Sequence, residues 1–341
     1  MSTNISILRR LLMVATLAFT AVLAGEVQAA DATIDFSRAD AAPGNMHFVW
    51  IHGSISAKHN TDVRIQVHRY NEHTYILRQN PAVHWEAPFM YLLFGNDKAV
   101  LLDSGATAEA EYFPLLKTVN EVIARWEAAN GKSDTELVVL PLGSDFSQVQ
   151  GMAQFSARPN TLVIEPSTAG WQKYLALNKD VKGRGMLNLG SRQITVVSTP
   201  GLGGDAISLY DPYSDFLFTG NSFYAGRLVI RDFEAYKASL NRLLELTASM
   251  PVSMILGGRI EMSDYPGLDY TLRSNFRPRE APLQLGVDAL QDASRIVLLI
   301  NGKEDIHIHD HFIVMNGVGR GARAYGFPTY TPERFRQARL R

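Results

Sequence analysis

The 341-residue chain contains no cysteine, and none of its nine histidines lies between residues 85 and 306. The first absence excludes disulfides, thiolate nucleophiles and thiolate metal ligands, and it suits an oxidising compartment. The second leaves the long middle of the chain without imidazole, so neither of the ligand types that zinc prefers to oxygen is available there. Residues 85–306 therefore favour chemistry other than that of zinc.

The chain also lacks an excess of charge of either sign. Its 33 basic and 34 acidic residues leave a formal net charge of −1, which gives no basic face for nucleic acid or for an anionic membrane. A hydrophobic content of 46% is enough to bury a sizeable core in one large α/β domain or in two domains. We therefore expect a small molecule or a protein as the partner, and no nucleic acid.

Long apolar runs are absent except near the N-terminus. Arg9 and Arg10 precede an apolar run over residues 11–24, and Val27-Gln28-Ala29 follows as a small-residue cleavage site. This pattern predicts a signal peptide over residues 1–29, and no later stretch approaches the roughly 20 apolar residues of a membrane span. The mature chain is expected to be periplasmic or secreted. The arginine pair leaves a twin-arginine export route open.

Short segments rich in β-branched and aromatic residues, each bounded by turn residues, dominate the first hundred positions. Alternating strands and helices follow them. The predicted strands are 47–54, 63–70, 74–78, 89–94, 99–102, 137–140, 161–164, 193–197, 206–210, 216–219, 252–256 and 305–315. The predicted helices are 108–129, 147–155, 169–177, 233–249 and 283–293. Strands first and alternation afterwards indicate an α/β fold of two sheets with helices outside.

Four landmarks occur in a characteristic order: residues 99–105 (A-V-L-L-D-S-G), residues 138–151, residues 198–201 (S-T-P-G) leading to 218–221 (F-T-G-N), and residues 255–259 (I-L-G-G-R). In order and spacing they resemble the metallo-β-lactamase superfamily, particularly its glyoxalase II-like hydrolase branch. The resemblance spans about residues 75–260. It implies an αββα sandwich of two mixed sheets with outer helices.

With this resemblance we divide the chain into four parts. A signal peptide occupies residues 1–29, and N-terminal strands that pack on the core occupy residues 30–72. The metallo-β-lactamase-like domain covers residues 73–300, and a C-terminal strand and tail cover residues 301–341.

The family's defining motif, T-H-x-H-x-D-H-x-x-G, supplies ligands to two metal ions that lower the pKa of bound water. Residues 142–151 hold this place here and read L-G-S-D-F-S-Q-V-Q-G. The family's P-G-H, T-G-D and G-G-H turns become P-G-L, T-G-N and G-G-R. The positions that the resemblance assigns to metal ligands thus carry Gly143, Asp145, Ser147, Gln148, Leu202, Asn221 and Arg259.

These changes imply a member of the superfamily that keeps the fold and lacks the zinc site. Asp145, Asp205 and Asn221 could still offer oxygens to calcium or magnesium, but three side chains fall short of the six or more oxygens that calcium takes. Arg259 would also bring a positive charge to the same pocket.

Arg259 suggests three hypotheses. It forms an ion pair with Asp145 that replaces the metal, it extends from the pocket mouth to water, or it binds a small anion such as a carboxylate or phosphate. Ser147 could be proposed as a nucleophile, but no histidine or lysine base is at hand, and capping of the following helix is the simpler interpretation.

Near the C-terminus, His307, His309 and His311 alternate along the predicted strand 305–315 and would share one face. They offer an alternative zinc site. The simpler interpretation is an amphipathic strand, because same-face residues about 6.6 Å apart bind one ion only with strain. Trp50, Trp85 and the six early histidines are interpreted as sheet packing or edge residues.

The sequence therefore predicts an exported protein of the metallo-β-lactamase fold without a metal cofactor, which serves a binding or structural role. The alternative is a hydrolase of an ester, thioester or lactam that acts through a non-standard metal site, with zinc or another divalent metal as cofactor, or through none.

Overall fold

The computed structural model describes residues 33–37, 40–177 and 183–318, all of which belong to one compact unit. The predicted signal peptide and most of the predicted C-terminal tail lie outside these ranges. The signal peptide, the tail and the division of the chain into four parts stay predictions. In the described part of the chain, no helix is long and apolar enough to cross a membrane.

The first sheet contains the early strands in sequence order. Strands β1 to β4 pair antiparallel, and β5 and β6 then add in parallel, so the sheet is mixed. Its strands are β1 (Ile65–Asn71), β2 (Thr74–Gln79), β3 (Phe89–Phe94), β4 (Lys98–Leu102), β5 (Glu136–Leu140) and β6 (Thr161–Val163).

The second sheet is also mixed, because β10 pairs parallel with β12 and antiparallel with β9. Its order is β13 (Gln284–Leu285), β12 (Met254–Gly257), β10 (Phe216–Gly220), β9 (Ile207–Asp211), β8 (Gln193–Ser198) and β7 (Arg184–Asn188). A third sheet that the sequence did not predict joins β11 (Arg227–Ile230), β15 (Ile313–Asn316) and β14 (Asp305–Ile308).

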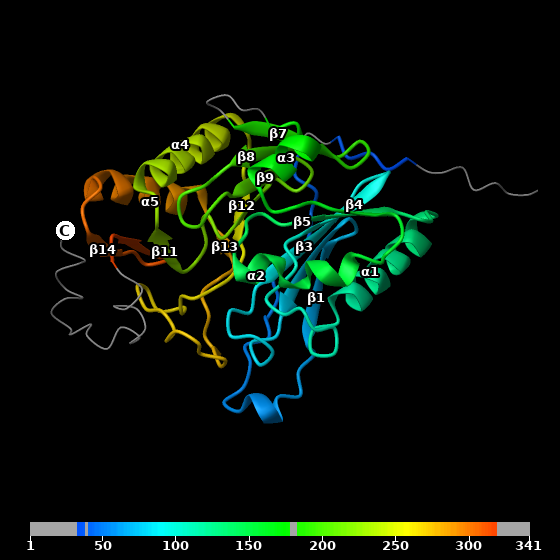
Figure 1. The fold of residues 1–341 in the computed structure, drawn as a ribbon, viewed down its shortest axis with the longest axis horizontal. Helices are drawn as coiled ribbons and strands as arrows, with labels where there is room; N and C mark the ends of the chain where they lie inside the picture. The colour runs from blue at the N-terminus through cyan, green and yellow to red at the C-terminus, as the bar shows by residue number, and fades with distance from the viewer. Residues whose placement is uncertain (1–32, 38–39, 178–182, 319–341) are drawn as a thin grey trace, which may run out of the picture. The chain divides into compact units, whose positions relative to one another are not determined.

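The side chains of β3 alternate between the two faces of the first sheet, and each face packs against a different layer. Phe89, Tyr91 and Leu93 belong to the core cluster that the first sheet shares with the second, and Tyr91 contacts the ring of Phe218 at 4.7 Å. Met90, Leu92 and Phe94 belong to a separate cluster with helix α1 (Leu115–Asn130). Figure 1 shows α1 outside the first sheet and α4 (Phe233–Ser249) outside the second. The predicted αββα sandwich of two mixed sheets with outer helices is confirmed.

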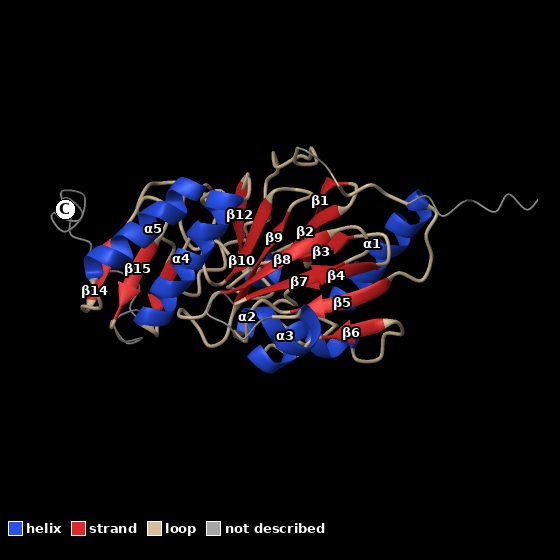
Figure 2. Cartoon of the chain, turned by 90° about the horizontal axis from the view of Figure 1, so that it is seen from above, coloured by secondary structure: helices blue, strands red, loops and turns tan. Residues whose placement is uncertain are grey.

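Capping residues and a proline set the first residues of the helices. The bounds of α4 match the prediction, and the Asp232 side chain caps it by accepting from the Ala235 N–H. Helix α1 begins at Leu115 and not at residue 108, because Pro114 suits the start of a helix and not its interior. Helix α3 (Thr168–Leu175) follows its Ser167 cap. Figure 2 shows α5 (Val287–Ile300) beside α4, near β15.

Several predicted elements were wrong in detail. Helix α5 starts at residue 287, not 283, because residues 284–285 pair with β12 and Gly286 precedes the helix. Residues 147–155 divide into α2 (Phe146–Val149) and a 3-10 helix (Gln150–Phe155). The predicted strand 305–315 is a hairpin, β14 and β15.

Residues 47–54 form no strand either, because a side chain replaces the strand pairing. The Gln66 amide of β1 accepts from the Ile51 N–H at 2.8 Å and donates to the Val49 carbonyl at 3.1 Å. The segment is thereby held along β1 through one residue and not through a backbone ladder.

A buried cluster around Arg192 ties the two sheets together. The Arg192 guanidinium, between β7 and β8, binds both Asp211 oxygens at 3.0 and 2.6 Å and donates to the carbonyls of His73 and Phe94, both at 2.8 Å. His73 Nδ1 in turn accepts from the Trp126 indole N–H of α1 at 3.0 Å. Burial and, secondarily, the neighbouring Arg192 charge lower the pKa of His73 to about 4.

We predict that His73 makes the fold sensitive to acid. Because its folded pKa lies below the ordinary 6.5, folding excludes a proton, and the free energy of unfolding falls as pH drops from about 6.5 to 4, by up to about 3 kcal/mol. A His73→Asn variant, whose amide oxygen can replace Nδ1 as acceptor, should flatten this fall in urea titrations. The exposed His59→Asn should not. An unchanged pH profile in His73→Asn contradicts the assignment.

Candidate functional site

The predicted ligand positions follow the carboxyl ends of strands in both sheets. Gly143, Asp145 and Gln148 follow β5, Leu202 follows β8, and Asn221 follows β10 directly. These five line one small hollow of about 10 Å³, which is room for about one water molecule. Ser147 reaches it through a hydrogen bond to Asn221. Arg259 follows β12 and lies outside the lining.

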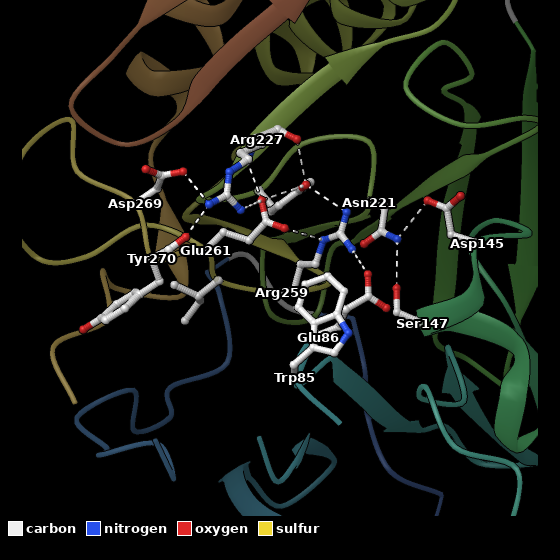
Figure 3. A network of polar contacts seen from close by, with 12 residues as sticks. Trp85, Glu86, Asp145, Ser147, Asn221, Arg227, Arg259, Glu261, Asp269 and Tyr270 are labelled. Atoms are coloured by element: carbon white, nitrogen blue, oxygen red, sulfur yellow. Dashed lines mark hydrogen bonds and ion pairs between the residues drawn. The ribbon is translucent and has the colours of Figure 1, made fainter. Parts of the chain in front are cut away.

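Asp145 does not pair with Arg259, so that hypothesis was wrong. The Asn221 amide donates to Asp145 Oδ2 at 3.0 Å and to Ser147 Oγ at 3.2 Å. Figure 3 shows Asp145 on the far side of Asn221 from Arg259. Asn221, at the position of the family's bridging aspartate, therefore acts as a hydrogen-bond donor.

Arg259 instead contacts two carboxylates that the sequence did not single out. One guanidinium nitrogen lies 2.5 Å from Glu86 Oε1, and Nε lies 3.7 Å from Glu261 Oε1. Its other terminal nitrogen donates to the Tyr224 hydroxyl at 2.9 Å. The side chain is 16% exposed and is engaged on three sides, so the hypothesis that it extends to water was also wrong. Tyr224 and the two carboxylates raise the pKa of Arg259 against the opposing effect of burial.

The network continues into the third sheet (Figure 3). Glu261 Oε2 accepts from the Arg227 backbone N–H at 2.8 Å and lies 3.5 Å from its guanidinium. Arg227 also pairs with Asp269 at 2.5 Å and donates to the carbonyl of Tyr270. Buried charges thus alternate in sign over Glu86, Arg259, Glu261, Arg227 and Asp269, as a low-dielectric interior requires.

Gln148, at the position of the third histidine, reaches inward to a buried acid. Its amide nitrogen lies 3.1 and 3.2 Å from the two oxygens of Asp103, which also accepts from the Leu142 N–H at 2.8 Å. Burial raises the pKa of Asp103 to about 7, although both hydrogen bonds act to lower it.

Zinc would not fit this set of residues. The side-chain nitrogens of Gln148, Asn221 and Arg259 donate hydrogen bonds and offer no lone pair to an ion, and the two amide oxygens are not the ligands that zinc prefers. A Cβ at Gly143 would lie 2.5 Å from Gln148 Oε1, so a histidine there would displace Gln148. Across residues 33–37, 40–177 and 183–318, no three or more His, Cys, Asp or Glu side chains are grouped to hold a metal.

Some of the oxygens proposed as ligands for calcium or magnesium already accept hydrogen bonds from other residues. Asp205 Oδ2 accepts from the backbone and the hydroxyl of Thr168, at 3.1 and 2.7 Å. Asp145 accepts from Asn221. Ser147 does not cap α2, because Asp145 is the residue that precedes the helix and Ser147 lies within it.

The three C-terminal histidines do not share one strand face. His307 lies on β14, whereas His309 and His311 lie in the turn before β15. His309 Nε2 contacts Asp292 of α5 at 3.1 Å, and its ring stacks on Phe312 at 4.4 Å. The turn is thus attached to α5 through His309.

Sequence reasoning missed the residues that the loop between β2 and β3 brings to the site. Glu86 pairs with Arg259, and the His84 ring lies 5.5 Å from that of Phe146, which is exposed. Only Glu261 left a signal, since it follows Arg259 by two residues. Glu86 is 173 residues from Arg259 in the sequence, so no local sequence pattern could predict their contact.

Comparisons with known proteins find partial likenesses. No model of a protein family matches the chain. Acyl-coenzyme A thioesterase MBLAC2 of Gallus gallus is 33% identical over 95 residues, a match that covers 27% of this chain and about a third (34%) of that protein's length. A metallo-β-lactamase from Pontibacter korlensis is 15% identical with a TM-score of 0.47, over 69% of this chain and 99% of that one. One from Erythrobacter litoralis is 14% identical with a TM-score of 0.48, over 69% and 97%.

We predict that Asp103 makes stability depend on pH in the direction opposite to that of His73, and that Asp103→Asn removes this dependence. Between pH about 4 and 7 the folded state keeps a proton that the unfolded chain has lost, so the free energy of unfolding falls as pH rises, by up to about 4 kcal/mol. Asparagine tolerates the left-handed backbone at this position, where φ is 63°. The variant should lose this fall in denaturant titrations. A fall equal to that of the unaltered protein would show that Asp103 does not titrate there.

We also predict that Arg259→Ala lowers the free energy of unfolding by about 3–5 kcal/mol, because it leaves Glu86 and Glu261 buried together without the charge that they share. The exposed Arg231→Ala is the control, and it should change stability by no more than about 0.5 kcal/mol. Equal effects of the two substitutions would show that the buried contacts of Arg259 carry no stability.

Proposed function

We propose that the chain is an exported member of the metallo-β-lactamase superfamily that has replaced its metal site by a network of protein side chains and serves as a binding protein. The observation that carries the proposal is the change from ligands to donors at the site. Gln148, Asn221 and Arg259 stand where the resemblance assigns metal ligands, and they donate to Asp103, Asp145 and Glu86.

Two features favour binding over catalysis. Ser147 is buried, and its hydroxyl accepts from the amide of Asn221, which cannot act as a base. The hollow at the former ligand positions holds about one water molecule, so a substrate group would have to displace Leu202 or Gln148 to enter. Arg259 already faces Glu86 and Glu261, which disfavours a further anion there.

The binding surface that we infer is the rim of this site. Exposed Phe146 lies beside His84, which precedes Trp85 and Glu86 on the loop between β2 and β3. Aromatic side chains at a rim suit a protein partner, because they bury apolar area at little cost in entropy.

A metal-dependent hydrolase is the second candidate, and its support is the local likeness to a thioesterase. Metal analysis distinguishes the two. Purified mature protein from zinc-supplemented cells is expected to contain less than about 0.1 zinc per chain by mass spectrometry. Stoichiometric zinc that is lost in Asp145→Ala would favour the hydrolase, and zinc lost in His309→Ala would favour the C-terminal histidines. Either result overturns the proposal.

Export is tested on the same material. The intact mass of protein recovered from the periplasm or medium should correspond to a chain that begins near Ala30. Recovery of the full chain, beginning at Met1, in the cytoplasm alone would contradict export.

A further inference from the structure

A second and larger cavity lies away from the former ligand positions. It has a volume of about 350 Å³, which is within the range of small-molecule pockets, and it shares no lining residue with the hollow at Asn221. Its walls are residues 46–50 with His52 on one side, and Arg277, Pro278 and residues 280–284 on the other.

The first wall is apolar and aromatic. Phe48 and Trp50 meet edge to face at 5.1 Å, and Trp50 packs in the same way against buried Phe89 at 5.0 Å. The Gln66 amide holds this segment along β1, and the His52 carbonyl accepts from the Arg277 N–H at 2.8 Å. Phe48 is 39% exposed, so this pre-organised wall is still open to a ligand.

Behind the opposite side lies a cluster of two guanidinium groups and one carboxylate, which has one positive charge in excess. Arg277, which lines the cavity, and Arg78, which does not, share Glu280 at 3.1 and 2.6 Å. Glu261 also attracts Arg277, but it is shared with Arg227 and Arg259. Among the described residues, Glu280 is the one acid that lines the cavity.

Arg277 shares its carboxylate with Arg78. It is 3% exposed, its two terminal nitrogens donate to the carbonyls of Ile260 and Trp85, and its Nε makes no well-directed hydrogen bond. Carbonyl oxygens compensate a buried cation only in part, so an anion nearby would stabilise it further.

We propose that this cavity binds a small organic carboxylate, whose apolar body lies on Phe48 and Trp50 and whose charge is attracted by the Arg78, Glu280 and Arg277 cluster. The site does not depend on the proposed loss of the metal, because none of its residues occupies a former ligand position.

Three probes of nearly equal shape test the charge preference on the full mature protein. By isothermal titration calorimetry, 3-phenylpropionate should bind at least tenfold more tightly than 3-phenylpropanamide, and 3-phenylpropylamine should not bind measurably. Equal affinity of acid and amide, or tighter binding of the amine, overturns the proposal.

Variants locate the site. Phe48→Ala should weaken binding of 3-phenylpropionate at least fivefold, whereas Tyr174→Ala, a similarly exposed aromatic residue outside the cavity, should leave it unchanged. His47→Glu, which adds a negative charge at the wall, should weaken binding at least threefold relative to His47→Gln. Binding that is unaffected by Phe48→Ala and His47→Glu places the ligand elsewhere and contradicts the assignment. Both positions are exposed, so these variants should fold.

Discussion

The contact between Arg259 and the carboxylates of Glu86 and Glu261 is the constraint on which the rest of the site depends. Two acids held close together away from water repel each other unless a positive charge lies between them. Here a guanidinium supplies it, with a delocalised charge and fixed donor directions that suit carboxylate oxygens.

The same logic extends to the neighbouring positions. Three acids at the site receive hydrogen bonds from residues that stand where the resemblance assigns ligands: Asp103 from Gln148, Asp145 from Asn221 and Glu86 from Arg259. Such bonds satisfy buried polar groups that would otherwise be costly, and they leave little space between them. The strands and turns that would position metal ligands therefore position a closed set of protein contacts.

Much of the fold could be predicted from the sequence. The strands β3, β5 and β10 are short apolar runs that are buried almost throughout, and helix α4 buries one face at helical spacing. The hairpin of β14 and β15 was missed because a turn at residues 309–312 interrupts a run that alternates like one strand. Residues 47–54 were mistaken for a strand because their pairing runs through the Gln66 side chain.

The site was predictable in its positions and not in its contacts. Motif order located Asn221 and Arg259 at the ends of β10 and β12, since strand ends follow from local sequence. The partner of Arg259 could not be predicted, because Glu86 lies on the loop between β2 and β3 and approaches Arg259 only in the folded chain. The cavity beside Trp50 could not be predicted either, because its two walls are more than 220 residues apart in the sequence.

The central claim, that the site depends on the contact between Arg259 and Glu86, is tested most directly by a double-mutant cycle. The free energies of unfolding of Glu86→Gln, Arg259→Met and the double variant are measured by urea denaturation at one pH. The account predicts that the double variant loses less stability than the sum of the single ones, by at least about 1.5 kcal/mol. Losses that add to within about 0.5 kcal/mol would contradict it.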